Sequence, residues 1–444
     1  MKRNLILLTV PCMALGALIG CRGAVKYDVK LLVYNWADYI YDGTENGKLV
    51  DKSTVKRFEE YYKEHFQKSL KVDYRTFSTP EEMYSQIKSG SISPDLICPS
   101  DYMIQKMANE GMLEKFSYDE AADKYGESLS NWETYASPYI MKRFKDSKLK
   151  DGSSFLQYAV PYFWGTMGFT YNPAKLTAED VSSWECLWSK ESKFQQKFSL
   201  KDSMRDTYVA GIFHVYHDEI IALDKTAENY NQLLNDIFNR CDDNTISEVE
   251  KALKEAKKTT VCRFEVDEGK DEIVKGNYDA NLAWSGDAVY SMDSAEQDNN
   301  VRLNYSLPSE GSNVWFDGWC MPKGAQVDVA EEFVNFLSQP EIAALNMDAV
   351  GYTSPIVGED IWELVNDWYA ADEGEETYEA DLSFYFGDSI DGEAKIEIPT
   401  SERGRQFDAQ YPTEDVLKKC CIMKDFGDQT RKVEEMWLRV KSYN

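Results

Sequence analysis

The segment Lys30-Leu-Leu-Val-Tyr34 is a short apolar strand that runs directly into Asn35-Trp-Ala-Asp-Tyr39. Residues 55–66 follow with the charge spacing of a helix, and residues 70–77 return to strand-like alternation. A strand followed by a helix and a second strand is the repeating unit of an α/β sheet. This opening therefore predicts an α/β fold with a parallel or mixed sheet.

The alternation of predicted strands and helices continues along the chain. Thr79-Pro-Glu-Glu82 combines a capping threonine, a proline at the first helical position and a glutamate that completes a capping box, so it predicts a helix start. The further expected strands cover residues 95–98, 198–200 and 280–283. The further expected helices cover 102–110, begin after Met204 and after Asp287, and cover 330–337 and 340–347.

The N-terminus has the features of a targeting segment. A positive start at Lys2 and Arg3 precedes an apolar stretch from Leu5 to Ile19, which is too short for a stable spanning helix. Leu18-Ile-Gly-Cys21 resembles a bacterial lipobox, so residues 1–20 are predicted to be a lipoprotein signal peptide and residues 21–28 a tether. Acylation of Cys21 would anchor the chain to a membrane; an ordinary secretory peptide with an incidental cysteine is the alternative.

Composition narrows the possible partners. The 444 residues include 49 Lys and Arg against 77 Asp and Glu, a net charge of -28. This charge argues against a nucleic-acid partner and is compatible with a cationic one. The length is sufficient for two domains.

Cysteine and histidine indicate neither a disulfide framework nor a metal site. Beyond Cys12 and Cys21 the cysteines are Cys98, Cys186, Cys241, Cys262, Cys320, Cys420 and Cys421. Their odd number and the lack of a C-x-x-C pair are not typical of a disulfide framework or a zinc site. A single bridge is possible, with partners that sequence does not identify. His214 and His217 could share a helix face, but the pattern favours no metal and no cofactor.

Aromatic and acidic residues recur where the predicted strands end. In open α/β sheets, ligands bind just beyond the carboxyl ends of the strands. Five clusters stand at such positions or after a Pro/Gly-rich segment: Asn35 to Tyr39, Pro99 to Tyr102, Lys201 to Asp206, Trp284 to Asp287, and Trp315 to Asp317. A lone tryptophan there is more often core packing and a lone aspartate a helix cap, but five clusters together favour a ligand site.

This pairing suits a polyamine, an aliphatic chain that carries ammonium groups. A cation over an aromatic face gains about 0.5–2 kcal/mol. Charge-assisted hydrogen bonds to carboxylates are roughly twice as strong as neutral ones. The clusters therefore provide flat walls for the methylenes and anions for the ammonium groups.

The motifs resemble those of the spermidine/putrescine-binding proteins of bacterial polyamine ABC transporters. The resemblance covers residues 29–360 and resumes at Tyr411-Pro412. Besides the five clusters, it rests on Pro161-Tyr-Phe-Trp-Gly-Thr166, Trp184-Glu-Cys-Leu-Trp188 and Gly351-Tyr-Thr-Ser-Pro355. It implies a two-lobed periplasmic-binding-protein fold of type II, with the ligand in the cleft between lobes.

The resemblance also implies a division of the chain. Lobe 1 would comprise residues 29–165 and 316–360, and lobe 2 residues 166–315 and 361–444. Residues 372–381 are strongly acidic, and the polar stretch that continues to Gln410 predicts a surface insertion at about 372–410 with no assigned chemistry.

Carried over by motif, the resemblance implies twelve ligand-binding residues. The aromatic box would be Trp36, Tyr39, Tyr102, Trp284, Trp315 and Tyr352. The polar contacts would be Asp38, Ser100, Ser203, Asp206, Asp287 and Asp317. Asp206 and Asp317 match carboxylates used throughout much of the family, whereas Asp38 and Asp287 match positions used in its putrescine-preferring members. Because Ser203 stands where a spermidine-preferring relative has an aspartate, the choice between spermidine and putrescine stays open.

The predicted function is therefore capture of a polyamine outside the cytoplasm and its delivery, through cleft closure, to an ABC transporter permease. The protein is expected to be a monomer, held at the membrane only by lipid at Cys21. A surface polyamine receptor uncoupled from transport is the alternative.

A zwitterionic ligand would need an arginine for its carboxylate, and Arg205 is the only arginine in the clusters. An enzyme is disfavoured because the acids are distributed over several loops and no catalytic motif is present.

Overall fold

The computed structural model describes residues 26–443 except positions 46, 120, 123 and 267. The predicted signal peptide and Cys21 lie outside the described residues, as does most of the predicted tether. None of the described helices combines the length and apolar character needed to cross a bilayer.

The first sheet is three-stranded and parallel. β1 (Val29–Trp36) lies between β4 (Leu70–Phe77) and β5 (Leu96–Ile97), and Leu31 and Val33 are fully buried. The predicted strand–helix–strand opening is confirmed. α1 (Thr54–Phe66) connects β1 to β4, and α2 (Pro80–Lys88) and α3 (Asp101–Asn109) follow β4 and β5. The Thr79 hydroxyl accepts the backbone N–H of Glu82 at 3.2 Å, so the predicted cap of α2 is confirmed.

The second sheet has seven strands and is mixed. β10 (Phe198–Lys201) lies between β11 (Val261–Glu265) and β12 (Ala280–Trp284), all parallel. β9 (Val160–Tyr171) then pairs antiparallel with β12, β13 (Asn304–Ser306) and β14 (Ser312–Trp319), and β18 (Cys420–Cys421) closes the edge. The helices over this sheet include α6 (Asp206–Val215), α9 (Asp243–Thr259), α11 (Ser285–Asn299) and α18 (Thr430–Lys441).

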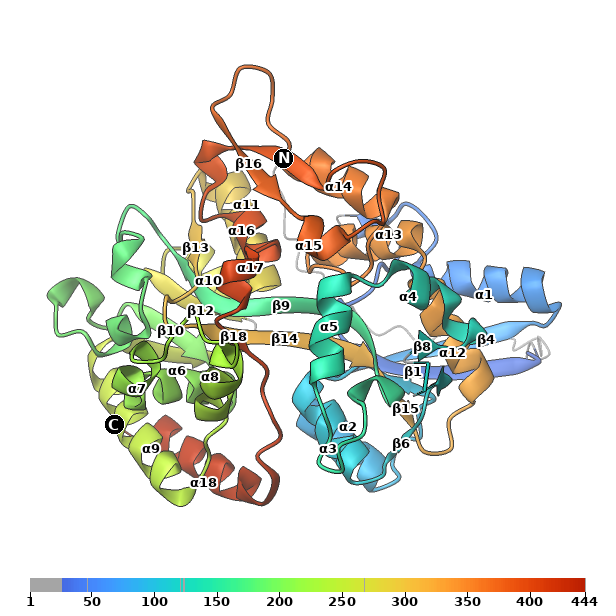
Figure 1. Cartoon of the computed structure of the whole chain (residues 1–444), viewed down its shortest axis with the longest axis horizontal. Helices are drawn as coiled ribbons and strands as arrows, with labels where there is room; N and C mark the ends of the chain where they lie inside the picture. Colours follow the sequence, from blue (N-terminus) through green and yellow to red (C-terminus); the bar gives the residue numbers. More distant parts are fainter. Residues whose placement is uncertain (1–25, 46, 120, 123, 267, 444) are drawn as a thin grey trace, which may run out of the picture.

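Two long antiparallel strands join the halves of the molecule. β9 and β14 are buried along their whole length, and their pairing runs from Val314 with Thr166 to Trp319 with Val160. Beyond it, Cys320 bridges to Ile97 at the end of the first sheet. Figure 1 shows both strands crossing between the two halves. The predicted two-lobed fold is confirmed.

The remaining elements are short or peripheral. The further strands are β2 (Thr44–Glu45), β3 (Lys48–Leu49), β6 (Leu113–Glu114), β7 (Tyr118–Asp119), β8 (Lys124–Tyr125) and β15 (Met321–Pro322). The further helices are α4 (Ser130–Tyr135), α5 (Pro138–Asp146), α7 (His217–Ile221), α8 (Tyr230–Phe238), α10 (Glu268–Val274), α12 (Val327–Leu337), α13 (Pro340–Val350) and α17 (Glu414–Leu417).

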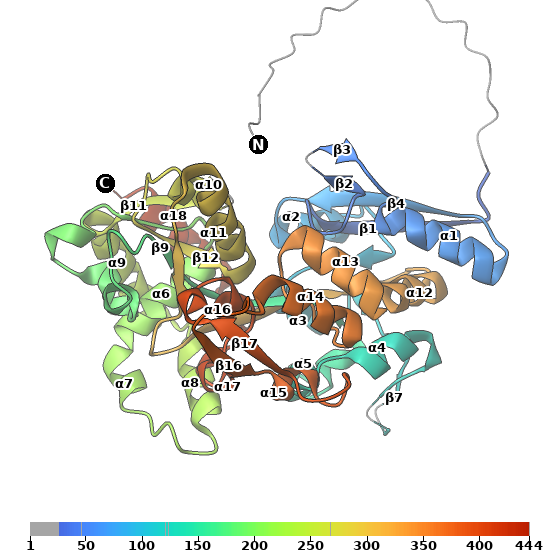
Figure 2. The ribbon, with the colours of Figure 1, turned by 90° about the horizontal axis from the view of Figure 1, so that it is seen from above.

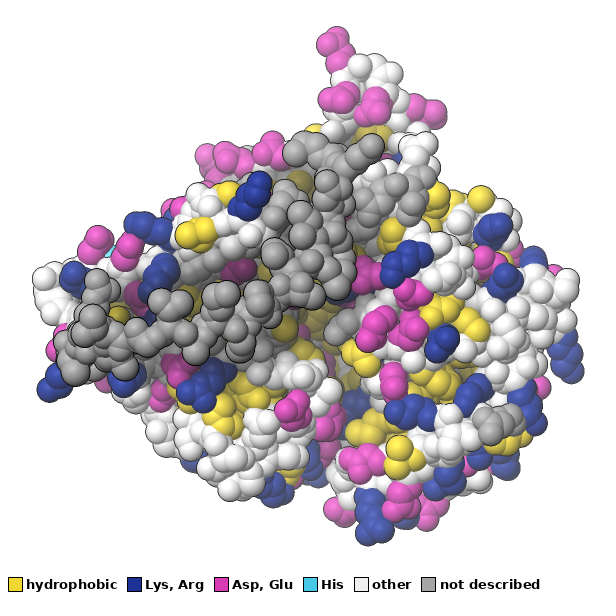
Figure 3. Space-filling model, turned by 180° about the vertical axis from the view of Figure 1, so that it is seen from behind, with side chains coloured by type: hydrophobic (Ala, Val, Ile, Leu, Met, Phe, Trp, Pro, Cys, Tyr) yellow, Lys and Arg dark blue, Asp and Glu magenta, His cyan; other side chains and the backbone are white. Residues whose placement is uncertain are grey.

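The acidic segment 372–410 has an ordered, partly buried structure. β16 (Thr377–Asp381) pairs with β17 (Lys395–Pro399), and α15 (Ser383–Phe386) lies between them in sequence. The residues of this segment that join the core include Leu382, Tyr385, Phe386, Ile396 and Ile398. Acidic side chains are exposed at residues 372–376, where the chain projects from the molecule (Figure 3).

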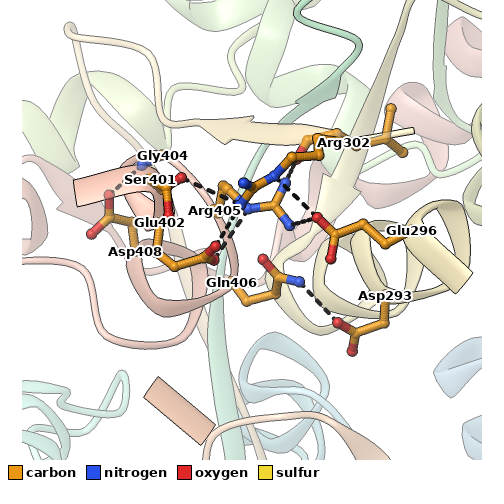
Figure 4. Close-up of polar contacts among 10 residues, drawn as sticks. Asp293, Glu296, Arg302, Ser401, Glu402, Gly404, Arg405, Gln406 and Asp408 are labelled. Carbon is orange, nitrogen blue, oxygen red and sulfur yellow. Dashed lines mark hydrogen bonds and ion pairs between the residues drawn. The ribbon is translucent and has the colours of Figure 1, made fainter. Parts of the chain in front are cut away.

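Elements around this segment contact both predicted lobes. α14 (Glu359–Tyr369) packs on α13 and α15 packs on α5, whereas α16 (Gln406–Gln410) packs on α11 (Figure 2). Arg405, which is 2% exposed, precedes α16 and connects it to residues of α11 and of the segment before β13. Its guanidinium donates to Leu303 O at 2.6 Å and pairs with Glu296 at 2.5 Å and with Glu402 at 3.1 Å (Figure 4).

One predicted helix start is wrong. α11 begins at Ser285, so Asp287 lies in its first turn and not before it. The reason is that Trp284 ends β12 in an extended conformation and the chain turns helical at once. A carboxylate in the first turn is favoured by the partial positive charge of the helix N-terminus.

The described cysteine and histidine residues form neither disulfides nor a metal-binding cluster. The seven described cysteines are all free. His214 contacts Glu185 at 2.8 Å, and His217 lies 3.5 Å from Glu310. In the part of the chain that the structure describes, no group of His, Cys, Asp and Glu is arranged to hold a metal ion.

Candidate ligand-binding site

Asp317 lies on β14, between the two lobes. Its side chain is 5% exposed, and its Oδ2 accepts the Tyr39 hydroxyl at 2.8 Å. Its Oδ1 is buried without a hydrogen-bond partner among the described residues. Burial raises the pKa of Asp317 to about 6, although the hydroxyls of Ser100 and Tyr39 favour the charged form. Oδ1 is therefore available to accept a hydrogen bond from a cationic group.

Three aromatic rings stand beside this carboxylate. The Tyr352 ring centre lies 5.3 Å from that of Trp315 and 5.7 Å from that of Tyr39, both edge to face. Trp315 is 9% exposed, and its Nε1 has no hydrogen-bond partner in the described structure. Trp36 packs instead on Phe77, with ring centres 4.8 Å apart. The structure therefore brings Tyr39, Trp315 and Tyr352 together as one aromatic wall.

The second half of the site comes from the ends of β10 and β12. Trp284 donates from Nε1 to Asp206 Oδ1 at 3.4 Å. Asp206 is 8% exposed, and burial raises its pKa. The Ser203 Oγ accepts the backbone N–H groups of Arg205 and Asp206, both at 3.2 Å, so this oxygen caps the start of α6.

Lys201 belongs to one of the five sequence clusters, but it was not among the twelve predicted ligand-binding residues. It is 1% exposed, and its Nζ lies 2.8 Å from Asp287 Oδ2 and 3.6 Å from the centre of the Trp284 ring. Tyr352 donates its hydroxyl to Asp287 Oδ1 at 3.1 Å. Burial opposes ionisation of Asp287, but Lys201 and Lys270 outweigh it and lower the pKa. The sequence signal was the position of Lys201, the last residue of a strand that enters the site.

Asp38 has a different environment from the other acids. It is exposed, with a φ of 51° in the left-handed region. With Tyr39, Lys71 and Asp73 it lines a groove of about 1110 Å³ on lobe 1. Asp38 thus lies on the surface of lobe 1, next in sequence to Tyr39.

Side chains from the two lobes meet beside the site. The Arg205 guanidinium lies 3.7 Å from the ring centre of Tyr102 and 4.4 Å from that of Phe426. The Tyr102 hydroxyl donates to Glu81 at 3.0 Å, and Gln105 donates to Met423 O at 3.0 Å. Arg205 is therefore used in a contact between lobes.

Comparisons with known proteins agree with this architecture. Residues 54–373 match the family model described as bacterial extracellular solute-binding protein. The spermidine/putrescine-binding periplasmic protein of Salmonella typhimurium is 25% identical over 329 residues, 73% of this chain and 77% of that protein. The putrescine-binding periplasmic protein SpuD of Pseudomonas aeruginosa is 24% identical over 438 residues, 96% and 95% of the two chains.

A solved structure extends the likeness to the whole fold. The spermidine/putrescine ABC transporter substrate-binding protein PotD from Streptococcus pneumoniae superposes with a TM-score of 0.61 at 24% identity, covering 93% of this chain and 99% of that one. The matched segment spans well over half of the present chain and includes both halves of the site. The chain belongs to the bacterial extracellular solute-binding protein family.

Proposed function

We propose that this chain binds a polyamine outside the cytoplasm and delivers it to an ABC importer. The observation that carries the proposal is the environment of Asp317. Its buried carboxylate has one oxygen held by Tyr39 and one without a partner among the described residues. The adjoining wall of Tyr39, Trp315 and Tyr352 is suited to methylene groups and to the face of a cation.

The chemistry of the relatives supports the ligand class. Those named above bind spermidine or putrescine according to their names, and they match this chain over most of its length. The site offers anions and aromatic faces, and its one arginine, Arg205, is engaged by Tyr102 and Phe426. This arrangement suits an ammonium ligand better than one with a carboxylate.

The proposed mechanism is closure of the lobes around the ligand. Asp317 and Tyr39 would hold it from one side and Asp206 and Trp284 from the other, so binding favours the state in which both sides meet. The proposal includes acylation of Cys21, which would keep the protein near a membrane-embedded permease, and a monomeric state. The twelve residues implied by the family motif remain the proposed lining of the ligand-binding site.

Calorimetric titration tests the binding step. The sample is the chain that begins at residue 22, freed of co-purified amine by unfolding and refolding, and the ligands are putrescine and spermidine. One site per chain with affinity for either amine supports the proposal, and a folded sample that binds neither overturns it. Uptake of labelled amine by cells that lack the protein tests delivery, and unchanged uptake would favour a receptor uncoupled from transport.

A further inference from the structure

A cation of the protein already lies in one of the aromatic and acidic positions of the site. The Lys201 ammonium contacts the Trp284 ring at 3.6 Å and Asp287 Oδ2 at 2.8 Å, and it donates to Val266 O at 3.2 Å. These are the two kinds of contact that a ligand ammonium group would make there. Lys201 is 1% exposed, so burial and these partners hold its ammonium in place.

The buried carboxylates of the site therefore differ in whether a lysine of the protein forms an ion pair with them. Asp287 pairs with Lys201, and the Lys270 Nζ lies 3.8 Å from its other oxygen. Asp206 and Asp317, in contrast, form no ion pair with any Lys, Arg or His that the structure describes. The side-chain hydrogen bonds of both acids are to neutral groups, Trp284 for Asp206 and Tyr39 for Asp317. The charges of Lys201 and Arg205 act on Asp206 without a direct ion pair.

A fourth buried acid, Asp101, lies close to Asp317. Burial and the charge of Asp317 raise the pKa of Asp101 well above its usual range. Its environment therefore disfavours a negative charge on this carboxyl group. Two buried carboxylates, Asp206 and Asp317, remain to balance positive charge on a ligand.

We propose that Lys201 is a specificity-determining residue: its ammonium fills the Trp284–Asp287 position in cis and restricts the cleft to a ligand with two ammonium groups, a diamine of the putrescine class. A triamine would place its third ammonium against Lys201, where the neighbouring carboxylate of Asp287 is already paired. Repulsion between like charges in a desolvated site then selects against the longer amine. This inference rests on the proposed function and deepens it by naming the ligand class.

The test compares the affinities for putrescine and spermidine in matched variants of the chain from residue 22, which keeps every described residue. Lys201→Met removes the charge and retains most of the side-chain volume. Lys201→Gln leaves a donor for Asp287 and serves if the methionine variant does not fold. Lys197→Met is the control, because Lys197 precedes the same strand at its other end and is 48% exposed beside Asp279.

We expect the original chain and Lys197→Met to prefer putrescine. In Lys201→Met or Lys201→Gln, removal of the charge should raise the spermidine affinity relative to putrescine about 10-fold or more. The double variant Lys201→Met with Asp287→Asn should lose that gain, because the carboxylate that would bind the third ammonium is gone.

The outcomes separate this inference from the proposed function. Binding of an amine with a ratio that the Lys201 variants leave unchanged, or a preference for spermidine in the original chain, overturns the inference alone. Binding by the Lys201 variants but not by the original chain keeps the role of Lys201 and overturns the proposed function. Binding of neither amine by any of the folded chains overturns both.

Discussion

The Tyr39 hydroxyl donates to Oδ2 of Asp317 at 2.8 Å, while Oδ1 of the same carboxylate is buried without a hydrogen-bond partner in the described structure. Tyr39 belongs to the loop after β1, and Asp317 belongs to β14, which crosses between the lobes. The hydrogen bond therefore connects the first sheet to the crossing strands. One oxygen of Asp317 is thereby oriented by the protein, and the other remains to accept a donor from a ligand.

Asp317→Asn should weaken binding of putrescine by about 1.5–3 kcal/mol, the usual scale for losing a charged hydrogen-bond partner. The amide retains an acceptor for Tyr39 but cannot balance an ammonium charge. Calorimetric titration measures the effect. Asp218→Asn, an exposed change on α7, is the control and should leave the affinity unchanged. Equal affinities for the Asp317 variant and the control would remove Asp317 from the site.

The same substitution should stabilise the ligand-free protein at neutral pH. Burial raises the pKa of Asp317 from 3.8 to about 6, so the folded state holds its proton more tightly than the unfolded state. Stability is therefore lost as the pH rises from about 4 to 6, and the loss at pH 7.5 amounts to about 3 kcal/mol at 1.36 kcal/mol per unit.

Asp317→Asn avoids this loss, so urea unfolding at pH 7.5 should give a higher unfolding free energy than the original chain. The difference should disappear near pH 4, where the original carboxyl group is protonated in both states. A less stable variant at pH 7.5 would show that the charged Asp317 is stabilised by partners other than Tyr39 and Ser100.

Ligand affinity should fall as the pH is lowered through about 6. Asp317 has a pKa of about 6 and Asp206 a raised one, whereas putrescine remains a dication throughout this range. Protonation of either carboxyl group removes an anion that the ammonium groups need. Titrations at pH 8 and pH 5 measure the change, which should be smaller in Asp317→Asn. An affinity that does not vary over this range would indicate that neither carboxylate contacts the ligand.

Much of the fold was predictable because its signals are local. The Thr79 cap and the apolar run of β1 involve residues close in sequence, and the structure places both as expected. In the acidic segment, local composition obscured the core. Ile396 and Ile398 alternate on β17 and are buried, but the surrounding acidic residues dominated the sequence pattern.

The site was predictable in its residues but not in their pairing. Motifs placed Asp287 and Trp284 at the end of one strand, whereas Lys201 ends the neighbouring strand, β10. Their contact depends on the pairing of β10 with β12, which is set by residues distant in sequence. Because a lysine at a strand end is more often solvated, its charge was not counted in the site.

Arg405→Met should destabilise the protein by about 1–3 kcal/mol, the scale for leaving buried polar groups without partners. The variant removes the donor to Leu303 O and the pairs with Glu296 and Glu402, and these glutamates recover part of their hydration because they are partly exposed. Urea unfolding measures the loss. Arg302→Met is the control, since that residue is 49% exposed and its ion pairs should contribute less than about 1 kcal/mol. Similar effects of the two changes would contradict an anchoring role for Arg405.

The last prediction concerns the contact between lobes. Arg205 precedes α6, and its guanidinium lies 3.7 Å from the Tyr102 ring centre at the start of α3. Because this contact forms only when the two sides meet, Arg205→Met should disfavour the closed state and weaken ligand affinity by about 0.5–2 kcal/mol.

Arg240→Met is the matched control, since Arg240 lies 4.5 Å from the Tyr216 ring centre and both residues fall within the predicted range of lobe 2. Calorimetry with small-angle scattering at saturating putrescine tests the idea. We expect a weaker affinity and a larger radius of gyration for Arg205→Met alone. If both variants behave alike, the Arg205–Tyr102 contact contributes to local packing and not to closure, because loss of an equivalent stacking contact within one lobe would then have the same effect.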